Sequence, residues 1–344
     1  MKNTEPQLEL LCNKSFIALL IMALLAPFSF ARNDLIGVEV HDEALLQKFK
    51  KFGDYGIAFI DLSDKKLGPQ IVVANIEGEI LRKFAVPSTR YSNDWIHWGP
   101  GITFDSNRKS IWYLAPKVGL TEFDIDGKVL HSINYEKASH QIQITSNGTF
   151  VIPYSWDTQN DYQLSEIDRD GLQLFGWHAA DFLKTNTTST SIANSQPLSY
   201  TATTSAVKTS SGNYFISLSQ NNTIIKINQS GKVLWSQTVS IRPHTLVIDG
   251  DELIGYSARD PNRIVIKNRS CQCFNSITIE ENLPKNVLTR SLSLQYLGEG
   301  FWFTSGVSSL YLLDENGRIF WKINRNNLKS RTTGFHSAVV FKSF

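Results

Sequence analysis

The sequence predicts an all-β fold made of repeated four-stranded units, and three observations carry this prediction. A turn of the form Asp/Asn-x-x-Gly recurs five times between apolar runs rich in β-forming residues. A second hairpin precedes these turns, and one copy of the unit is split between the two ends of the chain. Units of about 45 residues with several short strands are typical of β-propeller blades. The repeat therefore predicts a propeller.

The recurring turn sets the number of units. Asn or Asp followed by Gly accepts the positive φ angles of a tight hairpin, so each copy marks a hairpin tip. The turn glycines are separated by 49, 44, 60 and 86 residues, and the last gap holds a degenerate copy opened by Asn268, which makes six units. Two copies read D-x-D-G without continuing into the ligand spacing of an EF-hand, which favours turns over calcium loops. The glycines are Gly78, Gly127, Gly171, Gly231 and Gly317.

The second hairpin completes the blade and closes the ring. "HQIQITSNGTFVIP", "HTLVIDGDELIGYS" and "RSLSLQYLGEGFWFTS" each predict two strands around a turn, so a unit runs through strands A, B, C and D. The chain starts with a B strand, "GIAFIDLS", and ends with an A strand, "FHSAVVFKSF". Antiparallel pairing of 336–341 with 57–62 removes the open edges. The prediction is an all-β, six-bladed β-propeller over 55–344 with ring closure by the C-terminal strand.

The segments before the propeller predict export. The apolar run "SFIALLIMALLAPF" is followed by small residues, which is typical of a signal peptide over 1–31 that is cleaved after Ala31. An uncleaved membrane anchor is the alternative, because Glu5 and Glu9 make the start less basic than usual. We expect a secreted or periplasmic protein whose residues 32–54 form a leader with a short amphipathic helix at 41–52. A second short helix and a polar loop are expected at 177–198.

Charge and motifs exclude several classes of function. The formal net charge is +2, and cleavage after Ala31 removes two lysines and two glutamates, so it stays at +2. Such a chain has no general attraction for nucleic acid. Phosphate-binding loops, G-x-S-x-G and H-E-x-x-H are absent from the sequence, so nucleotide-binding, serine hydrolase and zincin functions lack support. We therefore predict no cofactor, no resident metal and no nucleic-acid partner.

Two further features have structural interpretations. Cys271 and Cys273 form the pair "CQC"; on a strand both thiols face one side and a bridge between them strains the geometry. A structural or incidental role is preferred, with a strained redox bond as the alternative. Trp235 and Trp321 each follow a turn glycine by four residues, and we expect both to pack between blades.

The histidines gather at equivalent positions of the repeat. Four residues before the last residue of strand A stand His140, Thr203 and His244 in three successive units, while His336 and His97 lie close to the same point in two others. Strand A lines the channel of a propeller, so its entries converge on one mouth. Imidazoles there can act as nucleophile, general acid/base or metal ligand. The alternatives are hydrogen bonds to loop backbone, or a metal-dependent hydrolase.

At "SHQIQITSNGTFVIP", "RPHTLVIDGDELIGYS" and the recurring "D/N-x-x-G-K-V-L-W" hairpin, the chain resembles the arylsulfotransferase family over about residues 70–340. The resemblance implies an extracytoplasmic six-bladed propeller that passes a sulfuryl group between phenolic molecules through a transient sulfo-histidine, without a nucleotide donor. His244 matches the family's covalent nucleophile and His140 a supporting histidine. "GWHAADFL" is similar to the family's "W-x-x-x-D-x-L" segment.

The anionic oxygens of a sulfuryl group need cationic or hydrogen-bonding donors, for which Arg259, Arg263 and Arg290 are candidates. Two positions depart from the family pattern: Thr201 or Thr203 stands in place of a histidine, and Gln220 in place of an arginine. The expected ligand is a small aromatic sulfate or phenol at the channel mouth, bound also by Thr203, Gln220, His97 and His336. A non-catalytic propeller that binds a small ligand or a protein at this mouth is the alternative, because the chain has lost part of the family's active site.

Overall fold

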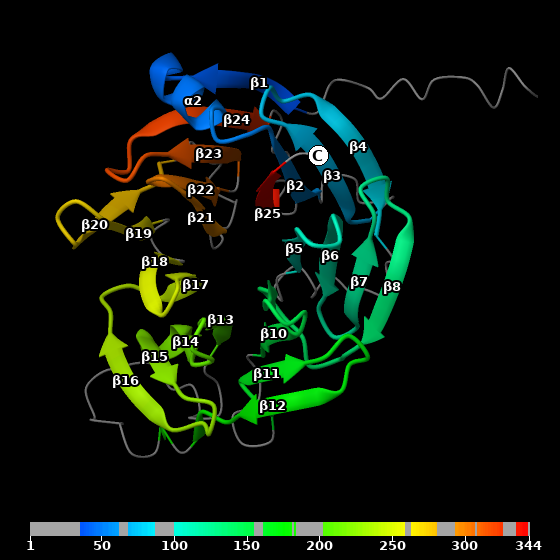
Figure 1. Ribbon diagram of the computed structural model, residues 1–344, viewed down its shortest axis with the longest axis vertical. Helices are drawn as coiled ribbons and strands as arrows, with labels where there is room; N and C mark the ends of the chain where they lie inside the picture. Colours follow the sequence, from blue (N-terminus) through cyan, green and yellow to red (C-terminus); the bar gives the residue numbers. More distant parts are fainter. Residues whose placement is uncertain are drawn as a thin grey trace, which may run out of the picture. The chain divides into compact units, whose positions relative to one another are not determined.

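Six antiparallel sheets stand side by side in a ring, each running from an inner to an outer strand (Figure 1). This arrangement is a six-bladed β-propeller, so the predicted fold class is confirmed. The computed structural model describes residues 35–61, 68–86, 100–154, 161–180, 182–183, 202–258, 263–280, 293–306, 308–325 and 335–342.

Blades 1 to 3 follow the predicted order of strands A to D. Blade 1 consists of β25 (Phe335–Lys342), β2 (Tyr55–Asp61), β3 (Gln70–Asn75) and β4 (Ile80–Ala85). Blade 2 consists of β5 (Gly101–Asp105), β6 (Ser110–Ala115), β7 (Gly119–Phe123) and β8 (Val129–Asn134). Blade 3 consists of β9 (Gln143–Ile144), β10 (Phe150–Pro153), β11 (Leu164–Ile167) and β12 (Gln173–Trp177).

Blades 4 to 6 repeat this order, and blade 6 carries a fifth strand. Blade 4 consists of β13 (Thr203–Lys208), β14 (Tyr214–Leu218), β15 (Thr223–Ile227) and β16 (Val233–Thr238), with the short 3-10 helix η1 (Ser219–Asn221) between its second and third strands. Blade 5 consists of β17 (Pro243–Asp249), β18 (Glu252–Ala258), β19 (Arg263–Asn268) and β20 (Cys273–Thr278). Blade 6 consists of β21 (Leu294–Gly298), β22 (Phe301–Ser305), β23 (Ser309–Leu313), β24 (Ile319–Arg325) and β1 (Leu35–Val40).

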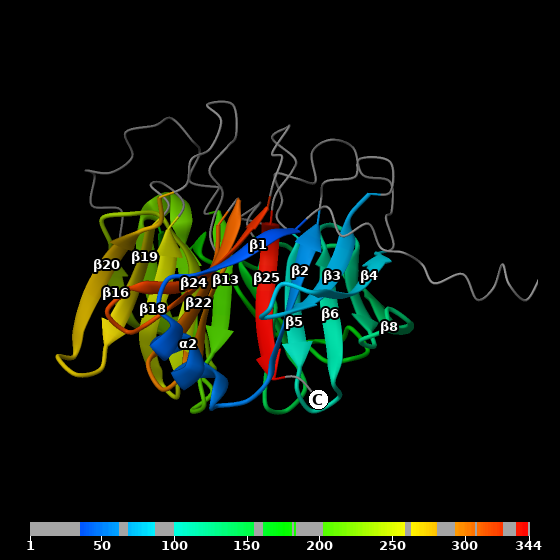
Figure 2. The same cartoon turned by 90° about the horizontal axis from the view of Figure 1, so that it is seen from above.

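The ring closes as the split repeat predicts. β25 is the innermost strand of blade 1 and pairs antiparallel with β2, with Ile57 opposite Val340 (Figure 2). The last strand of the chain thus supplies strand A to the blade whose other strands come first. Because this pairing joins the two ends of the propeller, the first and last blades hold each other in place without a covalent bond.

The leader before the propeller contains one expected and one unexpected element. The predicted helix is present as α2 (Glu43–Lys50); the side chain of Asp42 caps it by accepting the backbone N–H of Leu45, and Phe49 is buried. The sequence analysis missed β1, which pairs with β24. This strand covers the outer edge of blade 6, which would otherwise expose unpaired backbone groups. In the second predicted segment Trp177 ends β12, and residues 180 and 182–183 are helical, with the backbone N–H of Leu183 donating to the carbonyl of Ala179 at 3.0 Å. The predicted polar loop that follows lies outside the described residues.

The repeated turns use their Asx residue and their glycine for two separate purposes. In the turn after β7, Oδ1 of Asp124 accepts the backbone N–H groups of Asp126 at 3.0 Å and Lys128 at 2.8 Å, which confirms the turn interpretation. Gly127 has φ +90°, and a Cβ there would lie 2.4 Å from the ring of Phe84 in the preceding blade. A larger residue would therefore strain the backbone and separate two blades. The other four turn glycines likewise contact the outermost strand of the preceding sheet: Gly78, Gly171, Gly231 and Gly317.

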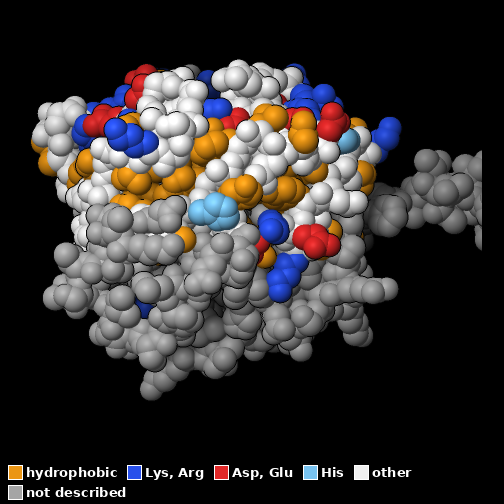
Figure 3. Space-filling model, turned by 90° about the horizontal axis from the view of Figure 1, so that it is seen from below, with side chains coloured by type: hydrophobic (Ala, Val, Ile, Leu, Met, Phe, Trp, Pro, Cys, Tyr) orange, Lys and Arg blue, Asp and Glu red, His pale blue; other side chains and the backbone are white. Residues whose placement is uncertain are grey.

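The two tryptophans after the turns differ in burial. Trp321 is fully buried, and its indole Nε1 donates to the carbonyl of Ile76 in blade 1 at 2.9 Å, as expected of a residue that packs between blades. Trp235 is 39% exposed on the outer strand β16, and its ring lies edge to face with that of Phe215 on β14 of the same blade, with ring centroids 6.1 Å apart. Other large apolar side chains are exposed on the outer strands too, and Figure 3 shows a band of apolar side chains on one side of the molecule.

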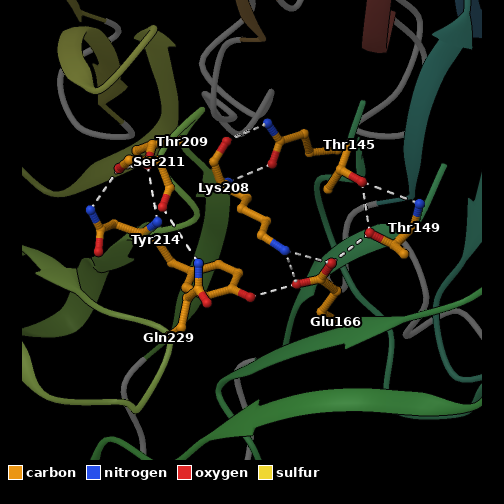
Figure 4. A network of polar contacts seen from close by, with 10 residues as sticks. Thr145, Thr149, Glu166, Lys208, Thr209, Ser211, Tyr214 and Gln229 are labelled. Atoms are coloured by element: carbon orange, nitrogen blue, oxygen red, sulfur yellow. Dashed lines mark hydrogen bonds and ion pairs between the residues drawn. The ribbon is translucent and has the colours of Figure 1, made fainter. Parts of the chain in front are cut away.

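A buried carboxylate joins blades 3 and 4. Glu166, on β11, is 4% exposed; its oxygens accept hydrogen bonds from Nζ of Lys208 at 2.8 and 2.9 Å, Oγ1 of Thr149 at 2.6 Å and the phenol of Tyr214 at 2.5 Å (Figure 4). Burial alone would raise the pKa of Glu166, but these hydrogen bonds hold it below its usual value. Burial and the neighbouring Glu166 raise the pKa of Tyr214. The carboxylate is therefore ionised and fully engaged at neutral pH.

The cysteine pair forms a disulfide, contrary to the expectation that strain disfavours a bridge. Cys271 and Cys273 are bonded, with their Cα atoms 5.2 Å apart. The expectation placed both residues on a strand, where Cα atoms two positions apart are separated by roughly 6.7 Å. Only Cys273 belongs to β20, while Cys271 lies in the turn and Gln272 has φ +57°. This left-handed residue shortens the span so that a bridge can form.

Candidate functional site

The structure brings together the two histidines that the sequence analysis selected as the reactive pair. The rings of His140 and His244 lie edge to face, with centroids 5.4 Å apart and planes at 60°. They come from blades 3 and 5, so the pair spans blade 4. Both residues are half-buried, and the Nδ1 atom of each ring is buried. Two imidazoles at this distance can act on one small molecule.

A β-bulge aims His244. Pro243 pairs with Ala258, but Leu246 pairs with Tyr256, so β17 has one extra residue between these two pairs. Bulges re-aim side chains and take backbone groups out of the ladder.

Hydroxyl groups satisfy the backbone groups that this bulge releases. The carbonyl of His244 accepts hydrogen bonds from the hydroxyls of Thr204 at 3.0 Å and Ser217 at 3.3 Å, both in blade 4. The backbone N–H of Thr245 donates to the hydroxyl of Ser257 at 3.1 Å. These contacts hold the backbone on both sides of the His244 Cα.

His140 is positioned by an unusual backbone conformation. Its φ of +64° lies in the left-handed region, which costs energy for a residue with a side chain and marks many functional sites. This conformation ends the ladder early, so β9 contains only two residues. The carbonyl of His140 passes directly over Gly101, where a Cβ would lie 2.1 Å from the carbonyl oxygen. Glycine at the start of β5 is therefore required for the observed position of His140.

We expect Gly101→Ala to displace His140. The new Cβ must push the His140 carbonyl away, which lowers the free energy of unfolding by about 2 kcal/mol and separates the two rings. Thermal unfolding and a crystal structure of the variant measure both effects. Gly176→Ala is the matched control, because the atoms nearest to a Cβ there belong to the side chains of Gln173 and Tyr162 and not to the backbone. An unchanged His140 in the Gly101 variant would show that the glycine has no positioning role.

One hydroxyl ties the two histidine segments together through blade 4. Ser205, fully buried on β13, donates a hydrogen bond to Oε1 of Gln141 and accepts one from the backbone N–H of Leu246 at 3.0 Å. Gln141 follows His140 directly, and Leu246 is two residues after His244. The separation of the two rings is thus set by a buried contact in the blade between them.

Register shifts and serine contacts like those at His244 occur in other blades too, and the sequence analysis did not predict them. The inner strands of blades 1 and 4 also change register at the level of the histidines, between Phe335 and Ala338 and between Thr203 and Ser205. In blades 4, 5 and 6 a serine hydroxyl near the end of strand B accepts a backbone N–H of strand A. The signal was present in the repeated endings "FISL", "GYSA" and "WFTS". The three serines are Ser217, Ser257 and Ser305.

Three further predicted site residues lie in the described part of the chain but in different surroundings. Thr203 is 0% exposed at the start of β13, so its hydroxyl faces protein rather than solvent. Gln220 is half-buried in η1. Arg263 begins β19 two strands outward from Pro243, through the pairs Pro243–Ala258 and Ala258–Arg263. Within the described residues its buried Nε has no hydrogen-bond partner, so this donor is available.

The remaining candidates are not described by the structure. His97, Thr201, Arg259 and Arg290 lie outside the described residues, as does the side chain of His336, whose backbone belongs to β25. Their predicted contributions to binding stay predictions. In the described part of the chain, no group of three or more His, Cys, Asp and Glu side chains is arranged to hold a metal ion. The metal-dependent hydrolase interpretation thus has no ligand set among those residues.

Comparisons with known proteins extend the fold but not the function. No protein-family model matches the chain, and no curated protein matches it in sequence. A protein of unknown function from Bacteroides caccae is 14% identical, with a TM-score of 0.57, and the match covers 85% of this chain and all of the other. Because similarity at this level shows the fold alone, it supports the propeller and assigns no activity.

Two other solved structures are more distant. Virginiamycin B lyase from Staphylococcus aureus is 15% identical with a TM-score of 0.43, covering 74% of this chain and 73% of the lyase. The β-propeller domain of Cps50 (Swd1) from Myceliophteria thermophila is 14% identical with a TM-score of 0.44, covering 75% and 80%. Similarity at this level carries no information about activity. Among the described residues, no helix is long and apolar enough to cross a membrane.

Proposed function

We propose that this protein is an arylsulfotransferase-like enzyme in which His244 and His140 transfer a sulfuryl group between phenolic molecules. The observation that carries the proposal is the 5.4 Å separation of the two imidazole rings, which are half-buried and come from different blades. Packing alone does not require a bulge at one histidine and a left-handed backbone at the other. Such irregularities are concentrated at functional sites.

The chemistry divides into two transfers. A ring nitrogen of His244 attacks the sulfur of an aryl sulfate; the S–N bond forms, the S–O bond to the ring breaks, and the phenolate leaves. An acceptor phenol then attacks the sulfo-histidine, the S–N bond breaks, and the new aryl sulfate departs. His140 gives a proton to the leaving phenolate and takes one from the acceptor. Covalent catalysis of this kind replaces one difficult step by two easier ones.

The sulfuryl oxygens need donors, and Arg263 is the cation that we assign to them. Its backbone is at the level of Pro243, and its buried Nε–H has no partner within the described residues. An unpartnered buried donor costs free energy unless a ligand uses it. Arg259 and Gln220 are expected to add further donors. We also propose that the protein acts outside the cytoplasm, as its first 31 residues indicate.

The direct test is turnover by the purified protein. Incubation with a sulfated chromogenic phenol and a second phenol as acceptor should release the chromophore in proportion to the acceptor sulfate formed. Incubation with the donor alone should leave one sulfuryl group on the His244 peptide in mass spectrometry. Neither product across a panel of donors would reject the proposal.

The second candidate is a propeller that binds small aromatic anions at the same pair without turnover. It is favoured by the threonine and glutamine at positions where the resemblance implies a histidine and an arginine, which makes the site less cationic. Saturable binding of an aryl sulfate by calorimetry, without turnover and lost in His244→Ala, would establish this function instead.

A further inference from the structure

The disulfide between Cys271 and Cys273 lies far along blade 5 from the histidine pair. It bridges the turn between β19 and β20, and both cysteines are exposed. Arg263, at the start of β19, is level with Pro243, whereas the disulfide follows the other end of that strand. The disulfide is therefore separate from the proposed sulfuryl-transfer site, and that site does not explain it.

The hairpin that carries the disulfide is already held by hydrogen bonds. β19 and β20 pair along six residues, from Arg263 opposite Thr278 to Asn268 opposite Cys273. Oδ1 of Asn268 accepts the backbone N–H of Ser270 at 2.9 Å, as in the other repeated turns. The Asn268 amide also donates to Oδ1 of Asn316 in blade 6 at 2.9 Å. These paired residues and side-chain contacts hold the hairpin in addition to the disulfide.

The bond also adds little by restricting the unfolded chain. The stabilisation that a disulfide provides grows with the logarithm of the length of the loop that it closes, and one intervening residue is a very short loop. Because the hairpin is also held by its hydrogen bonds, this bond contributes little as a structural crosslink. Its exposure leaves both sulfurs open to attack by a thiolate, which is the condition for exchange.

We propose that Cys271–Cys273 is a thiol–disulfide exchange site for an external dithiol. A thiolate of the partner attacks one sulfur; a mixed disulfide forms, and the other cysteine leaves as a thiolate that takes up a proton. The second thiol of the partner, as thiolate, attacks the mixed disulfide and releases the first cysteine. The partner is oxidised to its disulfide, and the pair is reduced to two thiols by the same two electrons.

The neighbouring residue indicates that the dithiol belongs to a protein. Phe274 follows Cys273 directly in β20 and is 51% exposed. An aromatic side chain beside the reactive bond gives a protein partner an apolar contact that glutathione lacks. We therefore expect Phe274→Ser to slow exchange with a reduced dithiol protein several-fold, and to leave exchange with glutathione unchanged.

The experiment uses the whole protein with Cys12→Ala, because the third cysteine would confuse thiol counting. Reduced glutathione at millimolar concentration should expose two thiols per molecule while the circular dichroism spectrum stays that of the folded protein. The single variants Cys271→Ser and Cys273→Ser, incubated with oxidised glutathione, should each form a mixed disulfide that is visible by mass spectrometry, with release of one molecule of reduced glutathione. The double serine variant should melt within about 3 °C of its parent, because so short a loop adds little stability.

Three outcomes would overturn the inference. One is a disulfide that stays closed in the folded protein and opens only on unfolding. Another is a double serine variant that fails to fold, since the bond would then be a structural crosslink. The third is failure of both single variants to form a mixed disulfide. Sulfuryl transfer is measured separately in the double variant, so failure of one proposal is distinguished from failure of the other.

Discussion

Replacing His244 by alanine should reduce sulfuryl transfer by at least about 10³-fold, because the nucleophile that forms the covalent intermediate is gone. His140→Ala should reduce the rate by about 10²-fold, as is usual when general acid/base assistance is lost but the nucleophile remains. The measurement is acceptor-dependent release of a chromogenic phenol. Neither change should lower the melting temperature much, because both rings are half-buried rather than in the core.

His41→Ala is the matched control for these variants. His41 is exposed in the leader, where its nearest charged partner is Glu39 at 3.7 Å, so its loss should leave the rate unchanged. The sulfo-peptide should vanish in His244→Ala and accumulate in His140→Ala if the second transfer needs the proton acceptor. Turnover that persists in His244→Ala would show that another residue carries the sulfuryl group.

Replacing Glu166 by alanine should lower the free energy of unfolding by about 3 kcal/mol, the usual result when one partner of a buried ion pair is removed. The change leaves the ammonium group of Lys208 without its carboxylate and removes the acceptor of Thr149 and Tyr214. Urea denaturation measures the loss. Tyr214→Phe removes a single hydrogen bond at the same place and should cost only about 1 kcal/mol.

The pH dependence of the free energy of unfolding provides an independent measure of the contribution of Glu166. Because the folded-state pKa of Glu166 lies below its unfolded value, its stabilisation is fully present above the unfolded pKa and is lost as pH falls through the folded pKa. Stability of the natural protein should therefore fall below about pH 5, since the unfolded carboxyl titrates near 4.3. Glu166→Gln should fall less steeply there. Equal slopes would mean that other carboxylates control the acid response.

The sequence predicted which histidines form the candidate site but not how the backbone positions them. The repeat placed His140 and His244 at equivalent positions two blades apart, and such positions on the inner strands converge on one channel mouth. It did not reveal that His140 adopts a left-handed backbone or that Gly101 makes room for it, since both depend on contact between different blades. Thr203 matched by alignment, but packing against the rest of blade 4 buries it completely.

The sequence pattern also did not predict the contacts that depend on tertiary structure. Glu166 stands two residues before the turn residue Asp168, and blade 2 has the buried Glu122 at the equivalent position. The repeat did not show that Lys208 and Tyr214 of the next blade contact Glu166. The leader was expected to contain a helix, yet its strand β1 could be found only once β24 was known to need an edge partner. The disulfide likewise depended on the turn at Gln272.

The sequence by itself determined the number of blades, the order of strands within each and the closure of the ring, because hairpin turns and strand periodicity are local properties written in consecutive residues. Tertiary structure alone decided which side chains meet at the inner strands. A bulge moves His244, a glycine admits the backbone of His140, and the hydroxyl of Ser205 sets the spacing between their segments. The last two depend on residues more than 35 positions apart, whose approach is governed by packing between blades rather than by local propensity.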